Sequence, residues 1–255
     1  MIRKSKDIIM ISVCMATYDG ERFIKEQIDS ILPQLSQDDE LIISDDGSTD
    51  RTLEIIASYK DERIKVFHHK KTGNKYYPTL KVCCSTSNFE NALNQAKGDY
   101  IFLSDQDDIW EKNKVEESLK LLKNYDCVFH NFSEIDDAGN LINEKFYKKN
   151  PLTFNPLKDI VHLNIWGCCI CFSRKILKLA LPIPEKVPQH DTWIGLVAEK
   201  NGTCFWNDEV LIKHRIYAGN TSFAGKKSEN PFLLKMCYRL NILKSLLKVK
   251  NRAEK

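Results

Sequence analysis

The sequence lacks the glycine-rich loops by which many nucleotide-binding proteins hold phosphate groups. Neither a GxGxxG stretch nor a Walker A stretch occurs among its 255 residues, which excludes the usual dinucleotide-binding and P-loop sites. A GxSxG stretch is also missing, which excludes the serine elbow of α/β-hydrolases. If this chain binds phosphate, the sequence predicts that acidic residues and a metal ion do the binding.

Long hydrophobic segments are absent as well. The apolar run that follows Met1–Lys6 is far too short to cross a bilayer, so we expect neither a secretory signal nor a transmembrane helix. Nine cysteines are present, among them the adjacent pairs Cys83–Cys84 and Cys168–Cys169. We predict that they are reduced, mostly buried thiols of a cytoplasmic protein and that they form no zinc site.

The charge is small overall but unevenly placed. The chain is 42% apolar and 29% charged, which is ordinary for a soluble globular protein. Its net charge is +3, whereas residues 226–255 carry nine Lys or Arg against two Glu. Because the basic residues are confined to this one tail, we expect no nucleic-acid partner.

Apolar and basic residues alternate at roughly helical spacing within that tail, over residues 231–248. Two interpretations remain open. The helix lies on an anionic membrane surface, or it packs on the preceding domain with its lysines in water.

The most informative segment is an apolar run that ends in acids. Tyr100–Ser104 is followed by Asp105, Gln106, Asp107 and Asp108. Five apolar or small residues without alternation favour a strand buried on both faces, as in a parallel sheet. Carboxylates at its end would lie where open α/β sheets bind ligands, and hard divalent ions take such ligands together with phosphate oxygens. The alternative is a solvated acidic turn.

A second acidic turn has the same form. Glu40–Ser44 is a short apolar run that ends in Asp45–Asp50. Gly47 permits a tight turn with positive φ, and Ser48 or Thr49 can cap a following helix. A carboxylate at such a strand end is well placed to bind a ribose hydroxyl or a base edge, although a plain strand–turn–helix would look similar.

Strands and helices alternate along the first half of the chain. Apolar runs predict strands at Ile8–Ala16, Leu41–Ser44, Ile64–Phe67 and Tyr100–Ser104. A helix that Pro33 kinks or shortens is expected between the first two, and Ser87–Glu90 is a capping-box pattern that predicts the start of another. This order predicts a parallel, doubly wound sheet.

The second half is less regular. Cys127–Phe132 suits a strand, and Asp136–Asn140 a hairpin turn. Gly167–Phe172 is a further apolar run, and 202–214 predicts one or two closing strands. Between these runs, Asp191 stands beside a helix with large apolar residues.

The two acidic segments and another one near the N-terminus together resemble a known family. Val13–Gly20 (VCMATYDG), Asp45–Asp50 (DDGSTD) and Ser104–Trp110 (SDQDDIW) are similar to successive signatures of bacterial family 2 glycosyltransferases, over about residues 8–222. The third resembles a rhamnosyltransferase-like branch. The resemblance implies a GT-A type α/β fold with a mostly parallel central sheet flanked by helices. It further implies a catalytic domain at 1–225, with a nucleotide-sugar-binding half at 1–110 merged with an acceptor half at 111–225, and a basic amphipathic tail at 226–255.

The same resemblance implies roles for individual residues. Nucleotide or donor contacts would come from Thr17, Asp19, Asp46, Asp105 and Asp108. The metal ion, Mg²⁺ or Mn²⁺, would be held by Asp107 and also by Asp105. On the acceptor side, Asp191 would act as the general base, with His190 and Trp193 beside the acceptor.

The chain departs from the family pattern in two places. The segment Lys70–Thr86, before Asn88 and Phe89, is longer than usual and is expected to shape donor or acceptor selection. The second departure is at Tyr217. Many relatives carry a histidine where this chain has Tyr217, and a tyrosine is a poor ligand for a hard divalent ion. His214 lies three residues earlier and cannot simply take its place. If the family histidine helps to hold the diphosphate, metal affinity is in doubt here.

The sequence therefore predicts an inverting, metal-dependent sugar transferase. Its donor would be a UDP- or dTDP-linked sugar, and its acceptor a growing surface polysaccharide or a lipid-linked glycan. The expected location is cytoplasmic, with possible attachment of the tail to the inner face of the membrane. Two alternatives stay open: an inert nucleotide-sugar-binding module, and a sugar nucleotidyltransferase.

Overall fold

The computed structural model describes residues 9–70, 74, 76–77, 82–218 and 230–249. Its strands are β1 (Ile11–Thr17), β2 (Glu40–Asp45), β3 (Ile64–His68), β4 (Tyr100–Ser104), β5 (Ile109–Trp110), β6 (Cys127–Ile135), β7 (Leu141–Asn143), β8 (Ile170–Ser173) and β9 (Cys204–Arg215). Its α-helices are α1 (Ile24–Ile31), α2 (Thr52–Ser58), α3 (Val82–Gln95), α4 (Lys114–Leu122), α5 (Pro156–His162), α6 (Arg174–Ala180), α7 (His190–Asn201) and α8 (Phe232–Lys248). Two 3₁₀ turns are η1 (Leu32–Gln34) and η2 (Gly167–Cys169).

The first half of the chain forms the parallel sheet that the sequence predicts. The strands lie in the order β3-β2-β1-β4 and every neighbouring pair is parallel. β1, β2 and β4 are buried almost throughout, which agrees with their unbroken apolar runs, since helices cover both faces of a parallel sheet. Parallel strands end at the same edge, so the acidic segments after β2 and β4 are brought to one side.

The second half extends the same sheet with mixed pairing. β8 joins β4 in antiparallel fashion, β6 follows β8, and β9 runs parallel to β6 before it pairs with β5. The predicted turn at Asp136–Asn140 connects β6 to β7 as an antiparallel hairpin, where Gly139 adopts φ +88°. A connection this short forces antiparallel pairing of β6 with β7, and the parallel pairing that the sequence predicts is found among the first four strands of the sheet.

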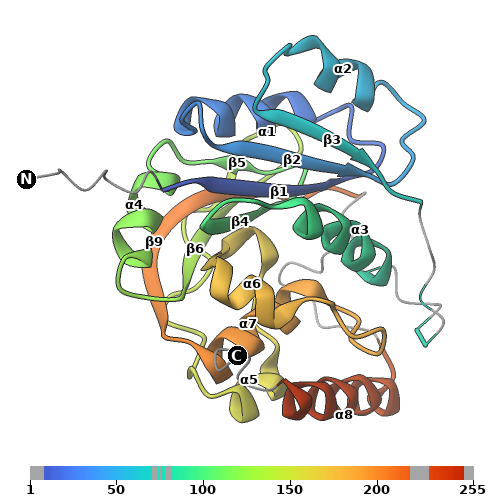
Figure 1. Ribbon diagram of the computed structural model, residues 1–255, viewed down its shortest axis with the longest axis vertical. Coiled ribbons are helices and arrows are strands. Elements are labelled where there is room, and N and C mark those ends of the chain that lie inside the picture. Colours follow the sequence, from blue (N-terminus) through green and yellow to red (C-terminus); the bar gives the residue numbers. More distant parts are fainter. Residues whose placement is uncertain (1–8, 71–73, 75, 78–81, 219–229, 250–255) are drawn as a thin grey trace, which may run out of the picture.

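Helices cover both faces of the sheet (Figure 1), and an apolar core lies on each face. One face packs against α1, α2 and α4, for example through Ile24, Ile28 and Ile56. The other face packs against α3, α6 and α7, for example through Leu93 and Leu177. The helix that carries Asp191 therefore lies on the second face.

Two helix boundaries test the sequence rules. Pro33 falls in η1, directly after α1, so it shortens the helix as expected. The capping-box prediction at Ser87–Glu90 is wrong, because α3 already begins at Val82. The Asn88 side chain instead donates to the Thr17 carbonyl at 3.2 Å, so a tertiary contact, and not a helix start, uses this polar residue.

The described part of the basic tail is helix α8, packed beside α5 and α7 (Figure 1). Its buried residues are Tyr238, Ile242 and Leu246, spaced at four residues along one face. Among the residues that the structure describes, no helix has the length and apolarity that a membrane span requires.

Candidate functional site

Three parallel strands deliver the site residues to one edge of the sheet. Thr17 ends β1 and pairs with Asp45 at the end of β2, while Met15 pairs with Ser104 at the end of β4. The first carboxylates after each strand therefore start from neighbouring positions. This edge is where open α/β sheets bind ligands, as the sequence predicts.

Gln106 connects two of these strand ends. Its Oε1 accepts hydrogen bonds from Thr17 Oγ1 at 2.6 Å and from the Tyr18 amide at 2.9 Å. Its Nε2 donates to the Tyr18 carbonyl at 3.1 Å. A Cβ atom on Gly20 would lie 2.4 Å from Gln106 Oε1, so only glycine fits there without displacing the side chain. Gln106 thus holds the loop after β1 against the loop after β4.

The loops after β1 and β2 are also joined. Asp45 Oδ2 accepts from the amides of Gly47 and Ser48, while Gly47 has φ +81°. Asp19 adopts φ +46°, and its Oδ1 accepts from the Thr49 amide at 2.7 Å. Asp19 and the Asp45–Asp50 turn are therefore one structural unit, with the Asp19 carboxylate already used by the protein.

Asp46 follows directly after β2 and is buried. Its Oδ1 is hydrogen-bonded to His69 Nδ1, and its amide donates to the Thr17 carbonyl at 3.0 Å. Thr17 is also buried, so it positions the loops through its hydroxyl and its carbonyl. No sequence pattern indicates the His69 contact, because it depends on β3 pairing beside β2.

Asp105 and Asp107 stand at the end of β4 with perturbed acidities. Burial, followed by the charges of Asp108 and Asp107, raises the pKa of Asp105 well above its usual range. Burial and the Asp108 charge raise the pKa of Asp107 to about 6, against a lowering effect of Tyr217. The Tyr217 hydroxyl donates to Asp107 Oδ2 at 2.8 Å. The residue that departs from the family pattern therefore touches the predicted metal ligand.

Asp108 is buried and faces β9. Its Oδ1 lies 2.8 Å from His214 Nδ1 and accepts from the Arg215 amide at 3.1 Å. Burial alone would raise the Asp108 pKa, but the charge and hydrogen bond of His214, the Arg215 amide and the Lys114 charge together lower that pKa. Burial likewise opposes the His214 imidazolium, but Asp108 holds the His214 pKa well above its ordinary value. The pair is an internal ion pair that fixes the acidic loop to β9.

Arg215 connects the end of β9 to three other segments: the acidic loop, the turn after β6 and α1. Its Nε donates to the Asp107 carbonyl at 3.0 Å, and its guanidinium also donates to the carbonyls of Asp136 and Asp137. A further N–H donates to Glu26 Oε2 on α1. Arg215 is buried, and burying a guanidinium costs free energy. These hydrogen bonds compensate that cost. The guanidinium thereby holds the acidic loop in place through the Asp107 carbonyl.

A third group, Cys168, approaches the same pair from η2. Ligand atoms of Asp108, Cys168 and His214 all lie within 4.8 Å of one another, and the three residues are buried. Asp108 Oδ2 has no hydrogen-bond partner among the described residues. Cys168 also has CxxC spacing with Cys171, but the Cys171 thiol is directed to the Val128 carbonyl at 3.7 Å. The seven cysteines that the structure describes are free thiols, as predicted.

Asp191 occupies the first turn of α7, which follows the extended segment at Gln189. It accepts from the Thr192 amide at 2.6 Å and from the Gly167 amide. Burial nevertheless raises its pKa to about 6. A Cβ atom on Gly167 would lie 3.4 Å from Asp191 Cβ and 3.9 Å from Leu103 Cδ1 of β4, so Asp191 lies near the end of β4. Its charge is one of those that raise the pKa of Asp105.

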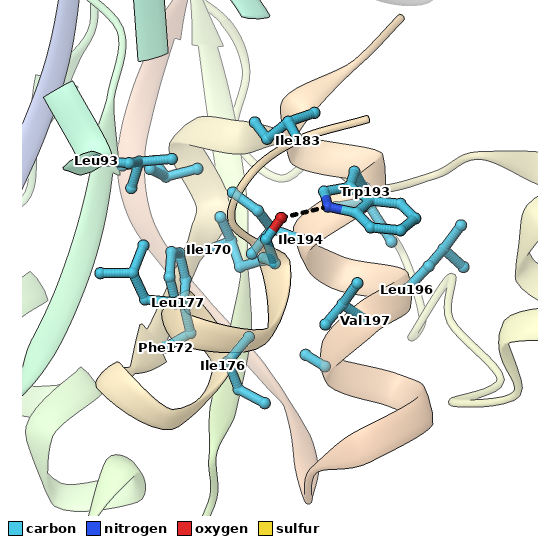
Figure 2. Close-up of a cluster of buried hydrophobic side chains, with 14 of the residues drawn as sticks. Leu93, Ile170, Phe172, Ile176, Leu177, Ile183, Trp193, Ile194, Leu196 and Val197 are labelled. Atoms are coloured by element: carbon cyan, nitrogen blue, oxygen red, sulfur yellow. Dashed lines mark hydrogen bonds between the residues drawn. The ribbon is translucent and has the colours of Figure 1, made fainter. Parts of the chain in front are cut away.

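The neighbours of Asp191 on α7 are less exposed than the sequence suggested. His190 stacks on Phe89 with ring centroids 3.9 Å apart, and burial lowers its pKa to about 3. Trp193 is 2% exposed, and Figure 2 shows its ring within the apolar cluster, its Nε1 donating to the Ala180 carbonyl at 2.8 Å. The predicted wall beside the acceptor therefore lacks this ring, because α7 turns Trp193 into the core.

The residues at the end of β4 fit a divalent cation. The carboxylates of Asp105 and Asp107 both have raised pKa values and repel each other, and a cation between them would remove that repulsion. Carboxylate oxygens are the donors that Mg²⁺ and Mn²⁺ prefer. Tyr217 engages one Asp107 oxygen, which leaves the other Asp107 oxygen and Asp105 as donors. The set formed by Asp108, Cys168 and His214 has softer donors and is enclosed by protein.

A family model describes most of this chain. The model for "Glycosyl transferase family 2" matches residues 12–179. The Bacillus subtilis glycosyltransferase TuaG, whose name assigns it to teichuronic acid biosynthesis, is 26% identical over 92% of this chain and 91% of its own length. The Escherichia coli protein WfgD, a UDP-Glc:alpha-D-GlcNAc-diphosphoundecaprenol beta-1,3-glucosyltransferase, is 27% identical over 85% of this chain and 81% of its own length.

Solved structures show the same architecture. Staphylococcus aureus TarS 1–349 in complex with UDP-GlcNAc superposes with a TM-score of 0.71 at 20% identity, covering 95% of this chain and 68% of that one. The mannosyltransferase PcManGT from Pyrobaculum calidifontis, in complex with GDP-Man and Mn²⁺, gives a TM-score of 0.59 at 16% identity over 86% of this chain and 62% of that one. At these identities the likeness concerns the fold, which is of the GT-A type.

Proposed function

The chain belongs to glycosyl transferase family 2, and on that premise we propose that it is an inverting, metal-dependent enzyme. It would move a sugar from a nucleoside-diphosphate sugar to a hydroxyl of a growing surface polysaccharide or a lipid-linked glycan. The observation that carries the proposal is the position of Asp191 near the end of β4, where Gly167 separates it from Leu103 and its charge acts on Asp105.

Asp191 has the properties of a general base. With a pKa of about 6, it is ionised at neutral pH yet basic enough to accept a proton, and such groups typically contribute about 10²–10⁴-fold. The acceptor oxygen would form its bond to the anomeric carbon while the bond from that carbon to the diphosphate oxygen breaks. The acceptor proton would go to the Asp191 carboxylate, and a single displacement inverts the anomeric centre.

Asp105 and Asp107 are the proposed ligands of Mg²⁺ or Mn²⁺. When bound, the cation would neutralise charge on the departing diphosphate. Gln106 keeps both acids in place through the loop after β1, and Arg215 holds the Asp107 carbonyl. Asp108, which is engaged by His214, would support these ligands from behind and would not reach the donor itself.

The proposed donor is a UDP- or dTDP-linked hexose or rhamnose. Asp19 and Asp46 lie in the joined loops after β1 and β2, where they would border the nucleotide. WfgD is named for UDP-Glc and for a diphosphoundecaprenol-linked acceptor, and TarS was solved with UDP-GlcNAc, which supports a UDP donor and a lipid-linked acceptor here. We further propose a cytoplasmic location with attachment to the membrane surface.

The Tyr217–Asp107 hydrogen bond favours one second candidate, an inert nucleotide-sugar-binding module. If the tyrosine occupies a position that the metal needs, the donor would bind without being activated. The acids and Asp191 would then be present without turnover.

Two measurements separate the candidates. Thermal stabilisation by UDP, dTDP, GDP and CMP, each with and without Mn²⁺, should give a metal-dependent shift for UDP or dTDP, because ligand binding to the folded state raises stability. Release of UDP or dTDP from the matching sugar nucleotide in Mn²⁺ then identifies an enzyme. A shift without release would support the inert module, and the lack of any shift would contradict both.

A further inference from the structure

Helices α5 and α8 share an apolar surface that is left exposed by the part of the chain that the structure describes. Of the large apolar side chains that are exposed in the described residues, seven lie on these two helices, with exposed fractions from 40% to 80%. We call this set the α5–α8 surface, and it consists of Leu157, Val161, Phe232, Leu233, Met236, Leu240 and Leu247.

The two helices hold this surface together as one unit. The Arg239 side chain donates to the carbonyls of Ile160 and Val161 at 3.3 and 3.0 Å, so α8 is fastened to the last turn of α5. Both helices pack on α7, and they lie side by side at the lower end of Figure 1. The surface is therefore part of the folded domain.

Burial divides α8 into two faces. Tyr238, Ile242 and Leu246 are directed into the core, whereas Leu233 and Leu240 lie on the opposite stripe and remain exposed. Packing on the domain therefore buries one apolar face of α8 and leaves the other apolar face exposed to solvent. Exposed apolar area of this kind marks an interaction site.

The charges around the surface select the partner. α8 contains Lys235, Arg239, Lys244 and Lys248 and no acidic residue, and Lys158 is exposed on α5. Apolar side chains surrounded by basic side chains match the interface of an anionic bilayer. The apolar side chains insert between the lipid headgroups, and the lysines attract those headgroups. A second copy of the same surface would bring like charges together, which disfavours self-association.

We propose that the α5–α8 surface docks on an anionic phospholipid membrane. The inference deepens the proposed function by naming the physical surface that brings a lipid-linked acceptor to the enzyme. Asn241 of α8 donates to the Tyr77 hydroxyl at 2.8 Å, and Tyr77 donates to the Lys186 carbonyl at 3.1 Å. Docking would therefore place the membrane on the side of the segment that leads into Asp191.

Vesicle co-sedimentation of the full chain tests the proposal. Wild-type protein should bind phosphatidylcholine vesicles that contain phosphatidylglycerol, and should bind pure phosphatidylcholine at least about tenfold less, because the lysines require anionic headgroups. The triple variant Phe232→Ser, Leu233→Ser, Leu240→Ser should bind the anionic vesicles at least about tenfold more weakly than wild type. The double variant Lys244→Gln, Lys248→Gln should weaken binding at low salt and differ less from wild type at high salt.

The exposed apolar pair on β7 provides a matched control. Leu141 and Ile142 are 55% and 57% exposed, so the variant Leu141→Ser, Ile142→Ser removes similar apolar area elsewhere and should bind as wild type does. Equal loss in this control, or wild-type protein that stays with the supernatant, would overturn the proposal. So would a wild-type dimer in light scattering that the triple variant converts to monomer.

Failure of docking can be distinguished from failure of the enzymatic proposal. The triple variant should keep the melting temperature and the nucleotide-induced shift of the wild type, because its three side chains are exposed. UDP or dTDP release from the donor in solution should also be unchanged. An inactive chain that still sediments with anionic vesicles would contradict the proposed function and leave the docking surface intact.

Discussion

Single carboxylates in this protein differ in role because their surroundings differ. Asp45 and Asp19 accept amide hydrogen bonds within turns, and Asp108 is neutralised by His214. Asp191 and Asp107 instead keep pKa values raised to about 6 by burial. Groups with perturbed acidity are candidates for chemistry, so the predictions at this scale concern these two acids.

Asp191→Asn should reduce sugar transfer by about 10²–10⁴-fold while the nucleotide-induced thermal shift persists. Because burial raises the Asp191 pKa to about 6, its ionised form is disfavoured in the folded protein at higher pH. The variant should therefore be more stable than wild type at pH 7.5, by roughly 1–3 kcal/mol, in urea unfolding. Full transfer activity in this variant would remove Asp191 from the mechanism.

Tyr217→Phe should weaken Mn²⁺ binding in the presence of UDP by about 10–100-fold, the usual effect of losing a group that orients a metal ligand. The reason is the hydrogen bond from the Tyr217 hydroxyl to Asp107. Calorimetric titration of Mn²⁺ measures the change. Tyr100→Phe is the matched control, since the Tyr100 hydroxyl donates to the Leu122 carbonyl away from the acids. Tighter binding in Tyr217→Phe would indicate that the tyrosine blocks the metal.

At the scale of elements, the close approach of β1 and β4 decides where the acids lie. The turn before β4 passes against β1 at Gly98, where a Cβ atom would lie 2.4 Å from the Ser12 amide nitrogen and 2.6 Å from the Ile11 carbonyl carbon. The Gly98 amide also donates to Ser12 Oγ at 2.7 Å. The backbone of β1 cannot yield without disturbing the sheet.

Gly98→Ala should therefore destabilise the fold by about 1–3 kcal/mol, as overpacking typically does. For a chain of this size that corresponds to a melting temperature lower by roughly 2–12 °C, measured by circular dichroism. Lys97→Ala changes an exposed neighbouring side chain and should stay within about 0.5 kcal/mol of wild type. If the two variants melt together, the contact with β1 is not tight.

For the whole molecule, several buried acids make stability depend on pH. Burial and the nearby Asp159 raise the pKa of Glu199 to about 9, and Asp107 and Asp191 titrate near 6. Each of these groups binds its proton more tightly in the folded state than in the unfolded state. The unfolded state therefore holds fewer protons, and stability falls as the pH rises through the folded pKa values. Burial lowers the pKa of Lys114. This opposes the loss of stability only at pH values at which Lys114 loses its proton in the folded protein.

Metal-free protein should consequently be less stable at pH 8.5 than at pH 6.5. One group that is protonated only when folded contributes at most about 1.4 kcal/mol per pH unit, so Glu199 alone accounts for roughly 1–3 kcal/mol. Urea unfolding in EDTA at both pH values measures the difference. Glu199→Gln should make the two values more nearly equal. A wild-type protein that gains stability toward pH 8.5 would contradict the assignment.

The sequence alone was enough to predict the parallel strands and the acids at their ends. Unbroken apolar runs identify strands that are buried on both faces, and the order of motifs pointed to the family that residues 12–179 match. Local patterns are less informative where a long-range contact uses the same residue. Asn88 belonged to a capping-box pattern but bonds to Thr17, and Trp193 was expected beside the acceptor but lies in the core.

Only the tertiary structure decided which of these residues meet. The Tyr217 hydroxyl reaches Asp107 because β9 returns beside the loop after β4, and Asp191 joins Asp105 because α7 packs under the second half of the sheet. The exposed stripe of α8 likewise follows from which of its two apolar faces the domain covers. Apolar runs and turn residues determine local structure because they act on residues nearby in the sequence. Contacts between residues far apart in the sequence depend instead on how the strands of the whole sheet pair.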